Sequence, residues 1–292
     1  MSDRWKKIGA KNSFSLVGVE ETLLGGQCFS WISLKKQQWI GVIGKSLVNI
    51  RWSDGQLFWC LAGGETLSES ELCTYLWLDH SYADAVNSLP WRSDPILCRA
   101  MDNFLGLRIL RQPIEEVLLV FILSSAKSIP QIKQLCQRIY KLLGEELMGG
   151  AYTFPGWCQL RNLTELQARK LGMGYRAKYL VGTAHFVSEN PNFLQDVQAL
   201  PYSQARTLLM QLPGVGPKVA DCVLLFGGKK NQAFPIDTWI LQSLEKQYGM
   251  KGWKLSQMEE FARIHFGEYA GLAQQFLFSY QRNFSDSNKA EV

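Results

Sequence analysis

Hydrophobic positions follow two different periods along this chain, and the change falls near residue 80. Before it, short runs rich in β-branched and aromatic residues predict strands over 39–43, 46–52 and 56–61. The dipeptides Gly44-Lys45 and Asp54-Gly55 separate these runs, and the second is a strong signal for a hairpin. We therefore expect strands and turns over 13–78, forming an antiparallel meander with one covered face.

After residue 80 the apolar positions take helical spacing. Residues 113–123 begin with Pro113, carry Glu115 and Glu116 in the first turn and are then nearly all apolar, which predicts a buried central helix. Further helices are predicted over 129–142, 163–171, 175–187, 203–211, 217–227, 237–248, 255–266 and 269–281. The predicted fold class is α+β, with a β-rich N-terminal domain over 1–106 and a helical region over 107–292.

Composition sets broad limits. The 292 residues are 47% hydrophobic and 20% charged, which is typical of an ordered globule of about two domains, and the net charge of +5 is compatible with nucleic acid. None of the seven cysteines forms a CxxC pair and none follows Cys222, so we expect reduced thiols and neither zinc nor an iron–sulfur cluster. Without a signal core or an 18-residue apolar run, we expect no membrane span and no secretion. The expected location is the cytoplasm or nucleoid of a bacterium, or the nucleus of a eukaryote.

A glycine-containing turn joins the predicted helices at 203–211 and 217–227. Gly214 and Gly216 lack a Cβ and can adopt positive φ, so the backbone there can approach a phosphate closely. The amides and dipole of the following helix favour an anion at the same place, with Leu212 and Val215 packed beneath the turn. This helix-hairpin-helix, about 203–227, predicts binding of the DNA backbone without sequence preference. An ordinary corner between two helices is the structural alternative.

Candidate catalytic groups follow the turn directly. Lys218, Cys222 and Phe226 share one helical face, with Asp221 at its edge. The helix dipole disfavours a protonated amine in the first turn, and a neutral lysine amine attacks electrophilic carbon. Asp237 is placed to cap the next helix, where it could stabilise positive charge or move a proton. A surface lysine paired with Asp221, and a purely structural cap, are the simpler explanations.

Several segments together resemble one enzyme family, in the same order along the chain. They are 24–31 (LGGQCFSW), 110–115, Ser124-Ser125, 171–179, the LPGVGPKVADC string at 212–222 and 269–274. These residues resemble the bifunctional 8-oxoguanine DNA glycosylases/AP lyases of the helix-hairpin-helix superfamily. The resemblance implies a TBP-like N-terminal domain, base excision repair of duplex DNA containing 8-oxoguanine, a monomer, and chemistry that requires no cofactor.

The resemblance also implies roles for single residues. Lys218 would attack C1′, expel the base as a Schiff base forms, and allow β-elimination of the strand, while Asp237 would support the cationic transition state. In the base pocket, Gly26 would accept the N7–H that only the oxidised purine carries. The other expected pocket residues are Cys222 and Phe278, which would sandwich the base, Gln274, which would read its Watson–Crick edge, and Phe226.

Other implied roles concern the DNA. Tyr175 would wedge into the gap left by the extruded base. Arg176 would contact the orphaned partner base. The backbone carbonyls of Met210, Leu212 and Val215 match the structural monovalent or divalent cation site of such hairpins.

The chain departs from the family pattern where the opposite base is read. Ala126 and Lys127 stand where an Asn-rich stretch is common in the family, and Gln131 stands where the family has an arginine. Of the residues that read the opposite cytosine in the family, only Arg176 remains. We therefore predict a relaxed preference for cytosine opposite the lesion. Lys127 would touch phosphate or the lesion strand. Trp239 replaces a common histidine, which puts the contact there in doubt.

Three other functions compete with this one. A superfamily glycosylase for another damaged base is the nearest, although iron–sulfur members carry four C-terminal cysteines and alkylbase members lack the lysine. A non-catalytic hairpin module that binds DNA would need neither Lys218 nor Asp237. A structural α+β protein would bind no duplex at all.

Overall fold

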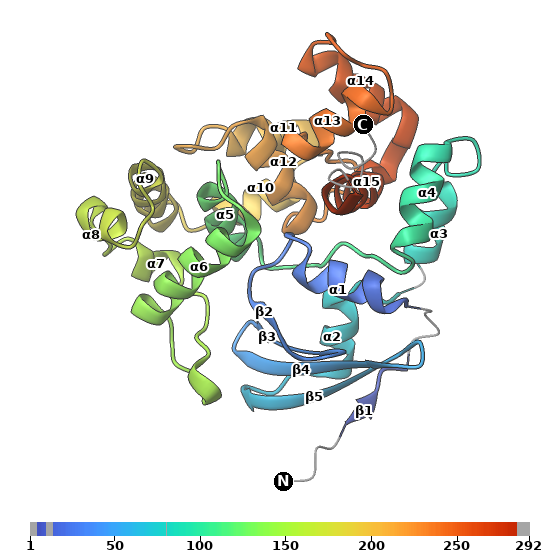
Figure 1. The fold of residues 1–292 in the computed structure, drawn as a ribbon. Helices are drawn as coiled ribbons and strands as arrows, with labels where there is room; N and C mark the ends of the chain where they lie inside the picture. The colour runs from blue at the N-terminus through green and yellow to red at the C-terminus, as the bar shows by residue number, and fades with distance from the viewer. Residues whose placement is uncertain (1–4, 10–13, 80, 285–292) are drawn as a thin grey trace.

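A five-stranded antiparallel sheet forms one end of the molecule, and helices form the rest, as seen in Figure 1. The computed structural model describes residues 5–9, 14–79 and 81–284. The strand order is β1-β5-β4-β3-β2. The strands are β1 (Lys6–Lys7), β2 (Trp31–Lys35), β3 (Gln38–Ile43), β4 (Ser46–Ser53) and β5 (Gln56–Gly64). The α+β fold class is confirmed.

The three strands expected from the sequence lie at the middle of this sheet. Trp39 pairs with Ile50, and Ile50 pairs with Trp59, so one row of large side chains crosses three strands. All three are buried, which gives the meander its covered face. Asp54 and Gly55 both have positive φ, 51° and 77°, as the tight hairpin turn requires.

Two helices interrupt the region that was expected to hold only strands and turns, so that expectation was wrong. They are α1 (Leu16–Leu24) and α2 (Glu69–Tyr75), and their buried residues join the core that the sheet's covered face forms. Capping fixes both: Ser15 Oγ accepts the amide of Gly18 at 2.9 Å, and Ser68 forms a capping box with Glu71. Short runs mixing Val, Leu and Thr do not by themselves separate a helix from a strand.

The helical region contains the predicted helices with shifted ends and four that were not individually predicted. The former are α5 (Ile114–Leu123), α6 (Ile129–Leu143), α8 (Glu165–Lys170), α9 (Arg176–Glu189), α11 (Tyr202–Leu209), α12 (Pro217–Phe226), α13 (Thr238–Lys246), α14 (Leu255–Phe266) and α15 (Ala270–Phe284). The latter are α3 (Ser81–Ser88), α4 (Pro95–Asn103), α7 (Trp157–Leu160) and α10 (Phe193–Ala199). Two 3₁₀ turns, η1 (Met148–Gly150) and η2 (Gly267–Tyr269), complete the elements. Helix α5 is buried along most of its length, as its sequence predicts.

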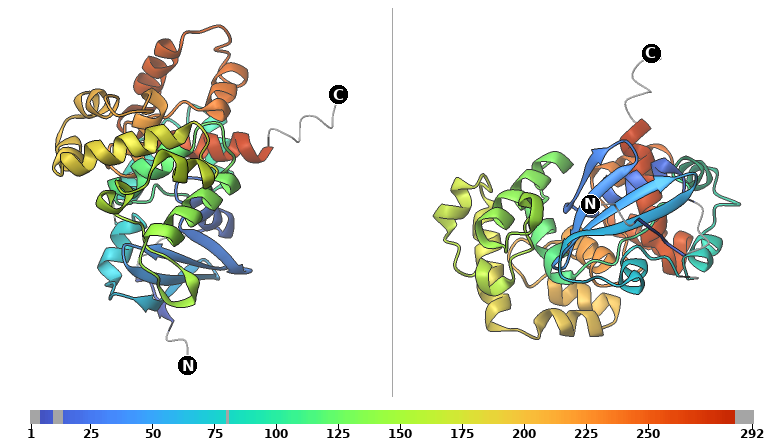
Figure 2. Two further views of the ribbon diagram at one scale, coloured as in Figure 1. Left: turned by 90° about the vertical axis from the view of Figure 1, so that its left-hand side faces the viewer. Right: turned by 90° about the horizontal axis from the view of Figure 1, so that it is seen from below.

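The described residues form two hydrophobic cores. One is formed by the sheet with α1 and α2, and the other is formed by the remaining helices. Buried residues of α3 and α4, such as Ala85 and Leu97, belong to the helical core, and the sheet core is built mainly from residues 8–78. Views from two other sides show α1 lying between the sheet and α15 (Figure 2). The proposed domain division at residue 106 stays a prediction. No helix in the described residues is long and apolar enough to cross a membrane.

Candidate active site

A pocket with a volume of about 990 Å³ lies where the two parts of the molecule meet. Its walls come from the loop after α1, from α5 and the loop that follows it, and from α12, α13 and α15. Nine residues singled out in the sequence line it: Gly26, Lys127, Lys218, Cys222, Phe226, Asp237, Trp239, Gln274 and Phe278. Gly26 and Phe278 are 252 positions apart in the chain, so the fold assembles these residues.

Lys218 is half-buried at the start of α12. Its Nζ donates to Ser124 Oγ at 3.3 Å and lies 5.1 Å from the ring centroid of Phe121. Phe121 stacks in turn on Phe226, with 5.4 Å between ring centroids. The amine is therefore held against an aromatic wall of the pocket. It is not paired with Asp221, which was the simpler explanation.

Asp237 caps α13 and accepts the amide of Ile240 at 2.9 Å. Burial raises the pKa of its carboxyl, and the Ile240 amide and the charge of Lys218 partly offset that rise. Burial likewise raises the pKa of the Cys222 thiol to about 12, against the opposing effect of Lys218. Cys222 is therefore a neutral apolar surface, and the Asp237 carboxyl lies close enough to Lys218 for the two groups to interact electrostatically.

The turn before β2 presents one unused carbonyl to the pocket. Gly26 has φ +103°, and a Cβ there would lie 2.7 Å from Ile129 Cδ1, so a side chain is excluded. The flanking carbonyls are occupied: Arg282 donates to that of Gly25 at 2.6 Å, and Gln112 donates to that of Gln27 at 2.7 Å. Among the described residues, the Gly26 carbonyl has no donor.

Helix α15 supplies the polar side chains of the opposite wall. Gln274 is 4% exposed; its Nε2 donates to the Pro235 carbonyl at 3.2 Å, and its Oε1 has no partner in the described structure. Phe278 lies one helical turn further on, half-buried, and lines the same pocket. A buried acceptor without a donor is costly unless a ligand satisfies it.

The hairpin glycines differ from each other. Gly214 has φ +77°, and a Cβ there would lie 2.5 Å from the ring of Tyr179, so packing within the protein demands glycine. Gly216 has φ −95°, which contradicts the expectation of positive φ, and a Cβ there would meet nothing within 4 Å. It precedes α12 without a side-chain cap. The helix N-terminus is thus left open to an outside anion.

Asp221 belongs to a buried network behind the hairpin. Arg206 of α11 donates to both of its carboxylate oxygens, at 2.9 and 3.1 Å, and the Tyr202 hydroxyl donates at 2.7 Å. Arg206 also pairs with Glu259 of α14 at 2.6 Å. Burial raises the pKa of Asp221 to about 6 even so. This network fixes the two hairpin helices to each other and to α14.

Tyr175 was expected to fill the gap in the opened duplex and Arg176 to read the partner base, but the two residues differ strongly in exposure. Tyr175 is 47% exposed, but Arg176 is 5% exposed. The guanidinium of Arg176 donates to the carbonyls of Ser125 and Met173 and lies 4.4 Å from the Tyr175 ring centroid. In this conformation Arg176 supports Tyr175 and the 125 loop, and it is not presented to a partner base.

Of the remaining predicted DNA contacts, Lys127 and Trp239 line the pocket and Gln131 does not. Lys127 follows Ala126, which has φ +50°, in the loop after α5. Gln131 is exposed, but its Oε1 accepts the amide of Ser128 in the capping box of α6. Trp239 is half-buried in the first turn of α13.

Several pocket residues were not assigned to the site from the sequence. Phe121 was placed only in a buried helix, because a nearly continuous apolar run does not mark its inward-facing members. Gln275 and Arg282 of α15 also line the pocket. No local pattern identifies them, although both are polar residues within a helix that is otherwise largely apolar.

The fold and this pocket define the class of the protein as a helix-hairpin-helix DNA glycosylase. Residues 10–118 match the family model of the 8-oxoguanine DNA glycosylase N-terminal domain. The chain is 31% identical to the N-glycosylase/DNA lyase OGG1 of Arabidopsis thaliana, with 87% of this chain and 74% of the relative covered. It is 29% identical to the N-glycosylase/DNA lyase of Saccharomyces cerevisiae, with 96% and 86% covered.

A solved structure agrees with these relatives. The 8-oxoguanine glycosylase/lyase of Clostridium acetobutylicum, in complex with double-stranded DNA containing cytosine opposite 8-oxoguanine, superposes with a TM-score of 0.85. The two are 30% identical, with 97% of this chain and 99% of the other covered. The chain belongs to the 8-oxoguanine DNA glycosylase/lyase family.

Proposed function

We propose that this protein excises 8-oxoguanine from duplex DNA and cleaves the strand at the resulting site, with Lys218 as the nucleophile. The observation that carries this proposal is one pocket that holds Lys218, Asp237 and the donor-free carbonyl of Gly26. A non-catalytic hairpin would need none of the three. The names of the relatives, N-glycosylase/DNA lyase, support both activities.

The chemistry begins with the neutral amine of Lys218 attacking C1′ of the extruded nucleotide. The C1′–N9 bond breaks, its electron pair leaves with the base, and a proton restores the base to neutrality. Asp237 stabilises positive charge developing on the sugar. The C1′–O4′ bond then breaks, O4′ takes the proton that the amine nitrogen gives up, and a C1′=N Schiff base forms. Loss of a C2′ proton then expels the 3′ oxygen by β-elimination.

Base selection uses the polar groups that the pocket leaves unpaired. The Gly26 carbonyl accepts the N7–H of the oxidised purine, and normal guanine has no hydrogen there. The unpaired Oε1 of Gln274 accepts an N–H of the Watson–Crick edge. Cys222 and Phe278 contact the two faces of the ring. An unmatched acceptor costs about 1–3 kcal/mol, so each acceptor disfavours a base that lacks its donor.

DNA is held by the open end of α12. Gly216 leaves space for a phosphate, and the first-turn amides and the helix dipole favour its charge. Lys127 and Trp239 flank the pocket mouth and contact the lesion strand, and Gln131 lies beside it. Exposed Tyr175 enters the gap left by the extruded base.

A cation at the hairpin is part of the same proposal. Among the described residues, the carbonyls of Met210 and Val215 accept no hydrogen bond, and that of Leu212 accepts only the Val215 amide at 3.1 Å. Free carbonyl oxygens on one turn suit a hard cation that also contacts a phosphate. The ion would be structural and has no part in the bond-breaking steps. With DNA as its substrate, the protein would act in the nucleoid of a bacterium or the nucleus of a eukaryote.

Borohydride trapping tests the function directly. A duplex carrying 8-oxoguanine should give a covalent adduct with the wild-type protein, because borohydride reduces the Schiff base to a stable amine. Lys218→Gln should give none while still binding the duplex. A wild-type protein that binds this duplex without forming an adduct or excising the base would leave the non-catalytic hairpin as the function. Efficient excision of a different damaged base in its place would indicate another superfamily glycosylase.

A further inference from the structure

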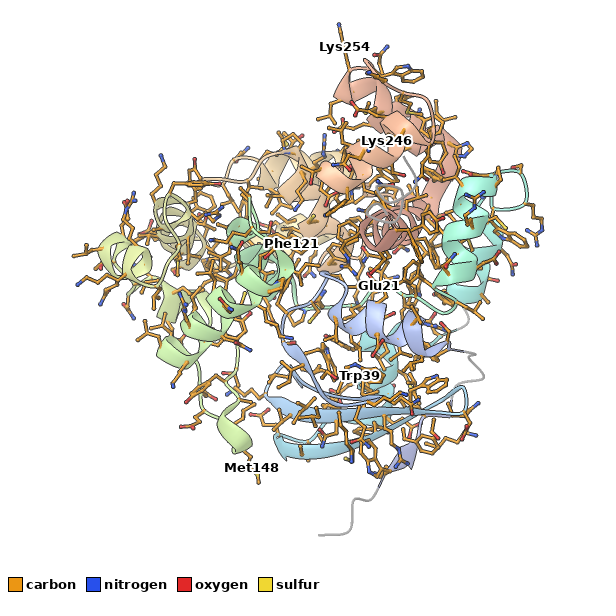
Figure 3. The ribbon with its side chains drawn as sticks, in the orientation of Figure 1. Glu21, Trp39, Phe121, Met148, Lys246 and Lys254 are labelled. Atoms are coloured by element: carbon orange, nitrogen blue, oxygen red, sulfur yellow. The ribbon has the colours of Figure 1, made fainter. Side chains whose placement is uncertain are left out.

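An ion pair joins the first and last helices of the molecule directly beside the base pocket. Arg282, in the last turns of α15, donates to both carboxylate oxygens of Glu21 on α1, at 2.6 and 2.7 Å. Ser279 donates to the same carboxylate at 2.8 Å. Glu21 projects from α1 toward α15, as Figure 3 shows. The Glu21 side chain is 9% exposed and that of Arg282 is 21% exposed, so water screens their interaction little.

The same guanidinium reaches the turn that presents the Gly26 carbonyl. Its second nitrogen, Nη1, donates to the Gly25 carbonyl at 2.6 Å, while Glu21 holds Nη2. The Gly25 amide donates to the Glu21 carbonyl at 2.9 Å. Glycine peptides have the widest conformational choice, so a Gly-Gly turn keeps one orientation only when neighbours fix it. Arg282 supplies that restraint on one side, and Gln112 supplies it on the other through Gln27.

Arg282 also contacts a second wall of the pocket. Its guanidinium lies 5.3 Å from the ring centroid of Phe278, one turn earlier on α15. A cation over an aromatic face restrains both groups. The Arg282 side chain therefore sets the position of the Gly25-Gly26 turn relative to the ring of Phe278, which is proposed to stack on the base.

We propose that Arg282 is a positioning residue for lesion discrimination, with Glu21 holding it in place. This inference rests on the proposed role of the Gly26 carbonyl. Arg282 does not touch the base: it fixes the direction of the acceptor that distinguishes an oxidised purine from guanine. A hydrogen bond tolerates little misalignment, so a turn released from Arg282 would lose selectivity before it lost DNA affinity.

Binding measurements separate this role from a simple contribution to stability. In the Lys218→Gln protein, which cannot react, we would measure the Kd for an 8-oxoguanine duplex and for the matching guanine duplex. The preference is the Kd for the guanine duplex divided by the Kd for the 8-oxoguanine duplex. Arg282→Met should reduce this ratio by up to about tenfold, the effect of losing the neutral hydrogen bond between the Gly26 carbonyl and N7–H. Arg282→Lys keeps a cationic donor and should restore part of the ratio. Arg263→Leu removes an exposed arginine paired with Glu260 and should leave the ratio unchanged.

A double variant makes the distinction decisive. Replacing a buried ion pair with two apolar residues is often neutral for stability, so Glu21→Met with Arg282→Met should regain much of the Tm that Arg282→Met loses. The Gly25 carbonyl still lacks its donor, and the ratio should stay low. A ratio that recovers with the Tm, or that Arg282→Met leaves within twofold of the parent, would overturn the inference. A parent protein without any preference for 8-oxoguanine would instead refute the proposed function, and this inference with it.

Discussion

The acid Glu116, in the first turn of α5, makes the stability of this protein depend on pH. Its carboxylate lies against α6, where the Tyr140 hydroxyl donates to it at 3.1 Å. Cys28, Cys136 and Tyr75 are other titratable groups near it, and all three are neutral, with their pKa values raised by burial. Burial raises the pKa of Glu116 from 4.5 to about 7, and the Tyr140 hydrogen bond offsets only part of that.

The sign and size of the effect follow from that raised pKa. Below pH 4.5 both folded and unfolded chains carry the protonated acid, and its ionisation costs no stability. Between pH 4.5 and 7 the folded chain keeps the proton that the unfolded chain has lost, so stability falls as pH rises. Above pH 7 the whole penalty applies, at most about 3 kcal/mol.

Glu116→Gln should remove this dependence. The amide oxygen still accepts from Tyr140, and no charge forms in the interior. Urea denaturation at pH 5, 6, 7 and 8 should show the variant gaining on the wild type as pH rises, by up to about 3 kcal/mol at pH 8. Glu115→Gln removes the same charge from the same helical turn and serves as the control. Parallel curves for Glu116→Gln and wild type would refute the burial argument.

Three other predictions concern the hairpin and the opened duplex. Gly214→Ala should lower the Tm, because φ is +77° and Tyr179 fills the space that a Cβ would need. Gly216→Ala should leave the Tm unchanged and weaken DNA binding measured by fluorescence anisotropy. Equal effects of the two variants on both measurements would contradict this contrast. Asp221→Ala leaves Arg206 paired with Glu259 alone and removes the acceptor of the Tyr202 hydroxyl, so it should cost about 1–3 kcal/mol in chemical denaturation, a loss under about 0.5 kcal/mol counting against the network. Excision of 8-oxoguanine opposite each of the four bases should favour cytosine only weakly, since Arg176 is buried; a strong cytosine preference in single-turnover assays would refute this.

Local patterns predicted most of the fold and the shared helical face of Lys218, Cys222 and Phe226, all of which line the pocket. The Asp54-Gly55 turn and the period-2 runs around it predicted the middle of the sheet, because hairpin geometry depends on a few adjacent residues. The helix starting at Leu16 was missed, since its decisive feature is one hydrogen bond that Ser15 accepts from the Gly18 amide in a mixed apolar segment. The resemblance contributed what spacing alone does not contain, namely that Gly26 and Phe278 face the same pocket as Lys218.

Contacts between distant segments are what the sequence could not supply, and they explain the differences between expectation and structure. Arg176 was expected to face the partner base, but the Ser125 carbonyl has no other donor among the described residues, and the long Arg176 side chain reaches it. Arg282 differs in the opposite way, because it was not expected in the site. It lies at the pocket because Glu21 of α1 and the Gly25 carbonyl accept hydrogen bonds from its guanidinium. In both cases the arginine lies where two segments leave backbone acceptors without partners. Carbonyls in a pocket that lack a donor, as that of half-buried Gly26 does among the described residues, are therefore the groups a substrate is expected to complete.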